Sequence, residues 1–258
     1  NQLMGKPKVD FHHYFGEIYG ERWGALAEAL RGEVLYETLH HPGCRPYHLD
    51  RSSAAAARAL GVEPGNRVLD LCAAPGGKSL LLATALQGRG ELISNEKSAL
   101  RRERLRRVID ESLPEPLRSV VQVTGHDAER WGLYEKEAYD RILLDAPCSS
   151  ERHLLAQPKL LKEWSPARSK QLARRQHAMI CAAFDALKPD GTLAYCTCAL
   201  SPAENDGVVG KLFKSRGEAV ELLPLEIEET EATQYGRIAL PDKTGGAGPL
   251  YCALLTKR

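Results

Sequence analysis

The chain lacks any run of about twenty apolar residues, so the sequence predicts no membrane-spanning helix. Its seven cysteines show no paired C-x-x-C or Cys/His spacing, and its eight histidines are scattered, so we expect no metal site. With 258 residues, the chain is too long to need disulfide bonds for its stability. These absences indicate a protein with reduced thiols and no bound metal.

A strong excess of charge of either sign is also absent. The 35 basic and 34 acidic residues leave a net charge of +1, so binding to a nucleic acid would require local basic patches. No internal repeat or low-complexity tract occurs, and no secretory signal is visible at the start. We therefore expect a cytoplasmic protein built from one large domain and a small extension.

The N-terminal part of the chain has a different pattern from the rest. Leu26, Leu30 and Val34 are spaced for one apolar helix face. After residue 60, short apolar runs alternate with helical patterns. We predict an N-terminal helical extension over residues 1–60 and a main domain over residues 61–258.

The main domain reads as alternating strands and helices, which predicts a mostly parallel, doubly wound α/β sheet. A long helix is expected to begin at Ser165-Pro166, because a capping residue is followed by proline at the first helical position. Ligands of such sheets bind beyond the carboxyl ends of the strands. The predicted strands cover residues 67–72, 91–96, 120–124, 139–145, 192–195, 220–223 and 250–255.

A glycine-rich turn, Ala73-Ala74-Pro75-Gly76-Gly77-Lys78, directly follows the first of these strands. It lacks the spacing of dinucleotide and P-loop phosphate motifs. Glu96 ends the second strand, where it can accept both hydroxyls of a ribose, and Asp127 follows the third, where it can accept from an adenine amino group. This set favours a ligand with an amino-acid end, such as S-adenosylmethionine. The alternative is that both acids cap helices.

Two cysteines follow later strands, Cys148 after Asp145-Ala146-Pro147 and Cys198 after Thr197. A thiolate that adds to carbon 6 of cytosine makes carbon 5 able to attack a sulfonium methyl group. Ser201 to Glu204 resembles a capping box, so a helix N-terminus would lower the pKa of Cys198. Asp145 could bind the cytosine amino group and ring nitrogen 3. The alternative is that both cysteines are buried small hydrophobic residues.

These motifs together resemble the Sun family of RNA cytosine-5 methyltransferases, from about Ser52 to the end of the chain. Arg152-His153 and Arg130-Trp131-Gly132 resemble the branch that includes the mitochondrial ribosomal RNA enzyme. The matching pieces are Val68-Leu69-Asp70-Leu71-Cys72-Ala73-Ala74-Pro75-Gly76-Gly77-Lys78, Asp145-Ala146-Pro147-Cys148-Ser149-Ser150, and Thr197-Cys198 with Leu200-Ser201-Pro202 and Glu204-Asn205.

The resemblance implies a Rossmann-like class I methyltransferase fold with a mostly parallel seven-stranded sheet and helices on both faces. It implies Cys198 as the nucleophile and Cys148 as the residue that assists product release. Lys78 and Asp145 would also face the target base. Cys196 departs from the family, which usually has serine there, and we expect this replacement to be neutral. The residues implied to contact S-adenosylmethionine are Cys72, Ala73, Ala74, Pro75, Gly76, Gly77, Lys78, Glu96, Asp127 and Asp145.

RNA is therefore the expected partner, with ribosomal RNA favoured over transfer RNA. The alternatives are a DNA methyltransferase and a non-catalytic ribosome assembly factor. A ribosomal particle or a partner protein could present the RNA. The aromatic residues between Phe11 and Trp23 are expected to pack onto the core rather than to stack on bases. The candidate phosphate-binding residues are Arg101, Arg102, Arg104, Arg106, Arg107, Arg168, Lys170, Arg174 and Arg175.

Overall fold

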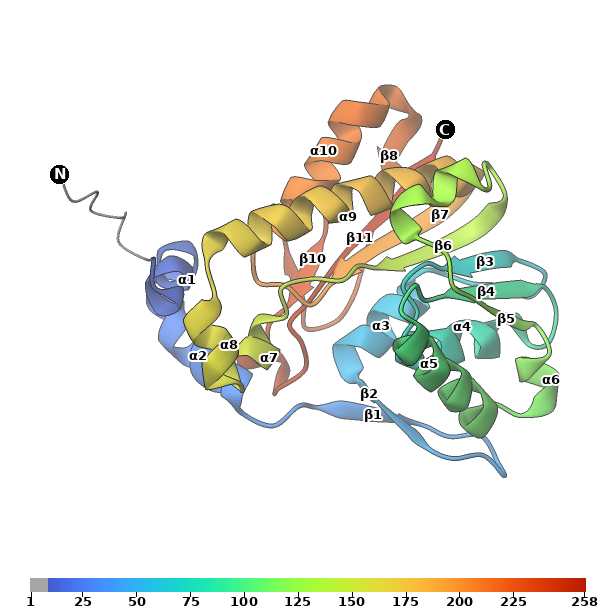
Figure 1. Ribbon diagram of the computed structural model, residues 1–258, viewed down its shortest axis with the longest axis horizontal. Coiled ribbons are helices and arrows are strands. Elements are labelled where there is room, and N and C mark those ends of the chain that lie inside the picture. The colour runs from blue at the N-terminus through green and yellow to red at the C-terminus, as the bar shows by residue number, and fades with distance from the viewer. Residues whose placement is uncertain (1–8) are drawn as a thin grey trace.

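A computed structural model describes residues 9–258 and places a large twisted sheet at the centre (Figure 1). The strand order among the described residues is β5-β4-β3-β6-β7-β11-β10-β9, and β8 also pairs with β11. The strands are β3 (Arg67–Asp70), β4 (Glu91–Asn95), β5 (Val121–Thr124), β6 (Tyr139–Asp145), β7 (Leu187–Thr197), β8 (Val220–Leu222), β9 (Glu231–Ala232), β10 (Arg237–Ala239) and β11 (Leu250–Lys257).

The five strands from β5 to β7 are parallel, and β11 runs antiparallel to β7. The α/β prediction is therefore confirmed, and each of the seven predicted strands is present. The sheet in the described residues has nine strands rather than seven, because the short strands β9 and β10 extend its edge. Their two and three residues were too few to show a period in the sequence.

Helices cover both faces of the sheet (Figure 1). Side chains alternate along each strand, so Ile142 and Leu144 of β6 join the core under α9 and α10, while Leu143 joins the core under α3 to α5. The principal helices are α3 (Arg51–Ala59), α4 (Gly77–Leu86), α5 (Ala99–Ser112), α9 (Pro166–Ala186) and α10 (Asp206–Arg216). The short helices are α6 (Glu115–Arg118), α7 (Glu151–Leu155), α8 (Pro158–Glu163) and α11 (Pro241–Thr244).

The N-terminal segment combines two helices with a hairpin. The predicted apolar helix face does not reach Val34, because α2 (Trp23–Arg31) ends where Gly32 turns extended. A hairpin of β1 (Tyr36–Leu39) and β2 (Tyr47–Asp50) follows, which the sequence pattern did not reveal. The division at residue 60 stays a prediction, and the first eight residues of that extension lie outside the described residues.

The N-terminal aromatic residues pack onto the core, as predicted. In α1 (Phe11–Tyr19), Phe15 is fully buried and stacks on Trp23 of α2 with ring centroids 5.4 Å apart. Trp164, before α9, packs against the same ring at 5.8 Å. This packing fastens the N-terminal helices beside α7 and α8, next to the carboxyl ends of the strands (Figure 1).

Over residues 9–258, no helix combines the length and apolar character that crossing a bilayer requires. The same residues contain no group of three or more His, Cys, Asp or Glu side chains arranged to hold a metal ion. All seven cysteines are free thiols.

Candidate active site

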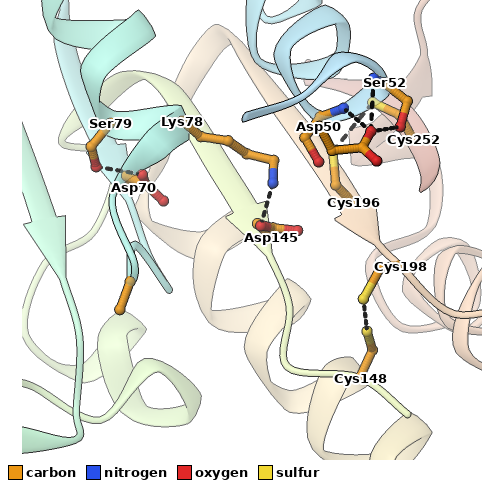
Figure 2. Close-up of polar contacts among 12 residues, drawn as sticks. Asp50, Ser52, Asp70, Lys78, Ser79, Asp145, Cys148, Cys196, Cys198 and Cys252 are labelled. Atoms are coloured by element: carbon orange, nitrogen blue, oxygen red, sulfur yellow. Dashed lines mark hydrogen bonds and ion pairs between the residues drawn. The ribbon is translucent and has the colours of Figure 1, made fainter. Parts of the chain in front are cut away.

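The carboxyl ends of β6 and β7 and the start of α4 bring the four predicted catalytic side chains to one region (Figure 2). Lys78, on the first turn of α4, donates to Asp145 at the end of β6, with Nζ and Oδ2 2.6 Å apart. Burial opposes the charge of Lys78, but the Asp145 carboxylate outweighs it and raises the Lys78 pKa. The pair therefore presents a fixed ammonium and carboxylate beside the two thiols.

Cys198 and Cys148 form a close pair of thiols. Their Sγ atoms lie 3.0 Å apart, and the Ser150 hydroxyl lies 3.2 Å from the Cys198 sulfur. The hydrogen bond from Cys148 lowers the pKa of Cys198, and a second bond from Ser150 acts in the same direction against the effect of burial. Donation to Cys198 and burial raise the pKa of Cys148. Cys198 is therefore the more acidic thiol of the pair, and Cys148 is the thiol that keeps its proton more readily.

The predicted capping box after Cys198 is wrong. Pro202–Glu204 form a single 3-10 turn, and α10 begins only at Asp206. Ser201 makes no side-chain cap, and the Glu204 carboxylate turns to Ser149 and Gln176 instead. The lowered pKa of Cys198 therefore comes from neighbouring thiol and hydroxyl donors rather than from the predicted helix N-terminus.

Cys198 and Ser150 line an open pocket of about 530 Å³, which we call the acceptor pocket. Three separate parts of the chain form it: the end of α2 with the start of α3, the segment after Cys148, and Gly248-Pro249. Arg152 joins these parts, because its guanidinium donates to the carbonyls of Gly32, Glu33, Gly246 and Gly248 at 2.5–3.1 Å. The N-terminal extension thus contributes directly to the pocket wall.

We expect Arg152→Met to raise the KM for RNA and to lower the melting temperature. Methionine keeps the apolar stem but leaves four carbonyls without their shared donor, at about 1.5–3 kcal/mol per charged hydrogen bond before water replaces it. Steady-state kinetics and thermal unfolding measure both effects. Arg89→Met, at an exposed position outside the candidate phosphate-binding residues, is the matched control, and an unchanged KM in Arg152→Met would contradict the role assigned to Arg152.

A second cleft, of about 280 Å³, lies beside the carboxyl ends of β3, β4 and β5, and we call it the donor cleft. Cys72, Glu96 and Asp127, predicted as cofactor-binding residues, all line it, and Pro147 connects it to the Cys148 segment. Glu96 is only 5% exposed and accepts from Ser98 N at 2.9 Å. Both acids also cap local turns, since Asp127 accepts from Glu129 N at 3.0 Å.

The glycine-rich turn connects β3 to α4, as predicted. Ala73 to Lys78 do not line the donor cleft, and Asp145 does not either. A Cβ on Gly77 would lie 2.6 Å from Tyr47 and 2.8 Å from Leu49, so glycine here permits close packing of the β1–β2 hairpin. Gly76 has a φ of 124°, which also favours glycine. Cofactor contacts of these residues stay a prediction.

We expect Glu96→Gln to weaken the binding of S-adenosylmethionine about tenfold or more. The amide removes the charge that strengthens hydrogen bonds to ribose hydroxyls, a loss of about 1.5–3 kcal/mol for a charged acceptor. Titration calorimetry measures the dissociation constant. Glu103→Gln, an exposed change on α5, is the control, and equal affinities of both variants would rule out Glu96 as a donor ligand.

Cys196 is not part of the thiol pair. Its sulfur lies 3.4 Å from Cys252 of β11, and both side chains are buried (Figure 2). Hydrogen bonding to Cys252 and burial raise its pKa, so it stays a neutral thiol. The expectation that Cys196 is a bystander agrees with this position in the sheet.

The basic residues divide into two kinds. Arg101 and Arg102 bond to the segment around Glu96, where Arg102 donates to the Glu96 carbonyl at 2.8 Å. Arg175 pairs with Glu129. Arg101 and Arg175 are exposed in spite of these bonds. The remaining candidates, all exposed, are Arg104, Arg106, Arg107, Arg168, Lys170 and Arg174.

Sequence reasoning missed the residues that support the two thiols. Ser150, Arg152 and the buried pair Glu151 and Glu204 all act by contacts with distant segments. The acidic residue Glu151 directly after two serines carries no helical or strand period that signals burial. Only the structure shows that the Glu151 carboxyl group is buried, which is rare for an acidic side chain.

The strand order and the two clefts at the strand ends define a Rossmann-like methyltransferase fold. A Pyrococcus horikoshii protein described as a methyltransferase homolog shares this fold with a TM-score of 0.75, 22% identity and 95% coverage of both chains. NSun6 from Pyrococcus horikoshii, solved with SFG, matches with a TM-score of 0.68 and 30% identity over 82% of this chain and 53% of its own.

The family model described as 16S rRNA methyltransferase RsmB/F matches residues 57–256, so the chain belongs to this Sun family. A mitochondrial tRNA (cytosine(34)-C(5))-methyltransferase from Danio rerio is 36% identical over 84% of this chain and 63% of its own length. The 5-cytosine rRNA methyltransferase NSUN4 from Bos taurus is 33% identical over 80% of this chain and 58% of its own. The chain thus spans about three fifths of these relatives.

Proposed function

We propose that the protein is an RNA cytosine-5 methyltransferase that uses S-adenosylmethionine and forms a covalent bond between Cys198 and carbon 6 of the target cytosine. The observation that carries this proposal is the position of the Cys198 sulfur on the wall of the acceptor pocket, with the Cys148 sulfur 3.0 Å away. Membership of the RsmB/F family supports it.

The residues of the donor cleft suit S-adenosylmethionine. Two carboxylates at successive strand ends can accept from ribose hydroxyls and an adenine amino group, while the cleft reaches Pro147 beside the thiols. The NSun6 structure holds SFG, an analogue of this cofactor. When bound, S-adenosylmethionine supplies an electrophilic methyl group on a sulfonium sulfur.

The side chains divide the work on the cytosine. The Cys198 sulfur forms a bond to carbon 6, and the displaced electron pair makes carbon 5 nucleophilic toward the methyl carbon. After methylation, the carbon 5 proton must leave to a base, and the returning electron pair breaks the bond between carbon 6 and Cys198. Cys148 holds a proton on Sγ, which it can give to the departing Cys198 thiolate.

Lys78 and Asp145 orient the ring. The Asp145 carboxylate can accept from the cytosine amino group, and the Lys78 ammonium fixes that carboxylate through their 2.6 Å bond. In Figure 2 the Lys78 side chain extends from the start of α4 to Asp145, which lies between that helix and the thiol pair. This placement allows them to face the base while Cys198 attacks it.

Ribosomal RNA is the substrate that we propose first, in line with the description of the family. Transfer RNA is the second candidate, because the 36% identical relative is named as a tRNA enzyme. Tritium transfer from labelled S-adenosylmethionine to a small-subunit ribosomal RNA transcript, to small ribosomal subunits and to tRNA tests the choice. Bisulfite sequencing of total RNA with and without the gene then locates the cytosine.

The same assay addresses the remaining alternatives. Label in a DNA duplex but not in RNA would indicate a DNA methyltransferase, and binding of RNA without transfer to any substrate would indicate an assembly factor. Transfer to the particle but not to naked RNA would indicate that a ribosomal particle or a partner protein presents the substrate. A cytoplasmic location stays a prediction, which fractionation of cells tests.

A further inference from the structure

Two buried carboxyl groups meet at one serine hydroxyl behind the thiol pair. The Ser149 Oγ lies 2.6 Å from Oε2 of Glu204 and makes an even shorter contact with Oε1 of Glu151. Both glutamates are 0% exposed, and Ser149 is 1% exposed. Ser149 directly follows Cys148, whereas Glu204 lies on the segment that follows Cys198. The cluster therefore joins the two cysteine segments.

The number of protons in this cluster is limited. A serine hydroxyl has one hydrogen, so Ser149 can donate to only one of the two carboxyl groups. The other contact requires that a carboxyl O–H donates to the Ser149 oxygen. One of the two glutamates must therefore be protonated for both short contacts to be hydrogen bonds.

The remaining donors decide which glutamate holds the proton. Glu204 also accepts from Ser149 N at 2.9 Å and from the side-chain amide of Gln176 at 3.0 Å, whereas Glu151 accepts from Leu200 N at 2.9 Å. The richer set of donors stabilises a negative charge on Glu204. The neutral partner is then Glu151.

The surroundings of Glu151 favour its neutral form. Burial and, less strongly, the neighbouring Glu204 carboxylate raise the pKa of Glu151 to about 7. The other titratable groups that face it are Cys148, Cys198 and Tyr19 of α1, whose hydroxyl donates to the Leu200 carbonyl. None of these groups carries a positive charge. The groups that donate to the two carboxyl groups, which are Ser149, Gln176 and the backbone N–H of Leu200, are neutral as well.

We propose that Glu151 is a positioning residue that acts in its protonated form, and that the Glu151–Ser149–Glu204 cluster holds Cys148 against Cys198. Ionisation of Glu151 places two negative charges around one hydroxyl and forces the two cysteine segments apart. Cys148 then stops donating to Cys198. The inference concerns the geometry of the two thiols, and it rests on the proposed function only where methyl transfer is measured.

The sign of the pH effect follows from linkage. The pKa of Glu151 in the folded protein lies above that of an unfolded glutamate, which is about 4.3. The protonated group therefore stabilises the fold, and this contribution is fully present below the unfolded pKa. This contribution is lost as the pH rises towards and through about 7. The melting temperature of the wild type should therefore fall between pH 4.5 and pH 7.5 by more than in a variant with a neutral residue 151.

Glu151→Gln and Glu204→Gln are the variants that test the proposal. Glutamine at 151 imitates the protonated acid, since its amide donates to Ser149 and its carbonyl accepts from Leu200 N. Glutamine at 204 removes the negative charge and places an NH₂ group opposite Ser149 or Gln176, which donate to the wild-type carboxylate. We expect Glu151→Gln to flatten the pH dependence of the melting temperature, and Glu204→Gln to lower that temperature at every pH.

The reactivity of Cys198 provides a readout that needs no RNA. Alkylation by iodoacetamide, followed by mass spectrometry at pH 7, should be several-fold slower in Glu204→Gln, because loss of the Cys148 bond raises the Cys198 pKa and so lowers the fraction of thiolate. Glu151→Gln should react at least as fast as the wild type, because glutamine cannot ionise at pH 7, and the exposed Glu163→Gln is the control.

Two results would overturn the proposal. One is an equal loss of the Cys198 alkylation rate in Glu151→Gln and Glu204→Gln. The other is a melting temperature of Glu151→Gln that depends on pH as it does in the wild type. Failure of the proposed function would look different. The wild type would then transfer no methyl group to any RNA, while alkylation of Cys198 and the pH profile of unfolding would still discriminate between the two variants.

Discussion

Replacement of Cys198 by alanine is expected to lower methyl transfer to RNA by at least about a thousandfold. Carbon 5 of cytosine becomes nucleophilic only after a thiolate adds to carbon 6, and no other thiolate lines the acceptor pocket in residues 9–258. Cys148 cannot substitute, because it does not line this pocket and burial still raises its pKa after the bond to Cys198 is lost. Tritium transfer under single-turnover conditions measures the loss.

Binding of S-adenosylmethionine should be unchanged in Cys198→Ala. Cys198 is not among the residues that line the donor cleft, so calorimetry should give the same dissociation constant for S-adenosylmethionine in Cys198→Ala and in the wild type. Cys44→Ala is a matched control for thiol loss away from the pair. Full activity of Cys198→Ala would sink the covalent mechanism.

The second large effect is expected from Cys148→Ala, which should accumulate a covalent complex between RNA and protein. Elimination of Cys198 from carbon 6 returns a thiolate, and the wild type provides a proton donor 3.0 Å away. Without this proton donor, the bond between Cys198 and carbon 6 can still form, but it breaks slowly after methylation. A band of protein and labelled RNA that survives denaturing electrophoresis measures the trapped complex.

The pH dependence of this complex provides a further check. In the wild type, the bond from Cys148 lowers the pKa of Cys198. In Cys148→Ala that pKa rises, so a smaller fraction of Cys198 is thiolate at pH 7, and the complex should form faster at pH 9. The double variant Cys148→Ala, Cys198→Ala should form none. A complex that persists in the double variant would assign the bond to another residue.

Stability against pH combines opposite contributions. Glu151 favours folding at low pH, for the reason given above, and its contribution is lost as the pH approaches about 7. Asp127 acts in the other direction, because its bond to Lys97 lowers its pKa, so its contribution is present above the unfolded value and is lost in acid. The partial exposure of that pair keeps its contribution small.

The residues at the strand ends were predictable because their positions depend on a general rule. Parallel strands have their carboxyl ends at one edge of a sheet, so Glu96, Asp127, Asp145 and Cys198 had to lie along that edge once the strands were recognised. The alternation of apolar runs and helical patterns was sufficient for that recognition. The family motifs added the division of roles between Cys148 and Cys198.

The sequence by itself thus determined the α/β sheet and the edge where ligands are expected, since both follow from local periodicity and strand order, and its resemblance to the family indicated the candidate nucleophile. Only the tertiary structure decided which groups lower the Cys198 pKa, where Cys196 points, and that Glu151 and Glu204 meet at Ser149. These facts depend on angstrom-scale distances between side chains some fifty residues apart. No local pattern encodes such distances, because packing of the whole core sets them.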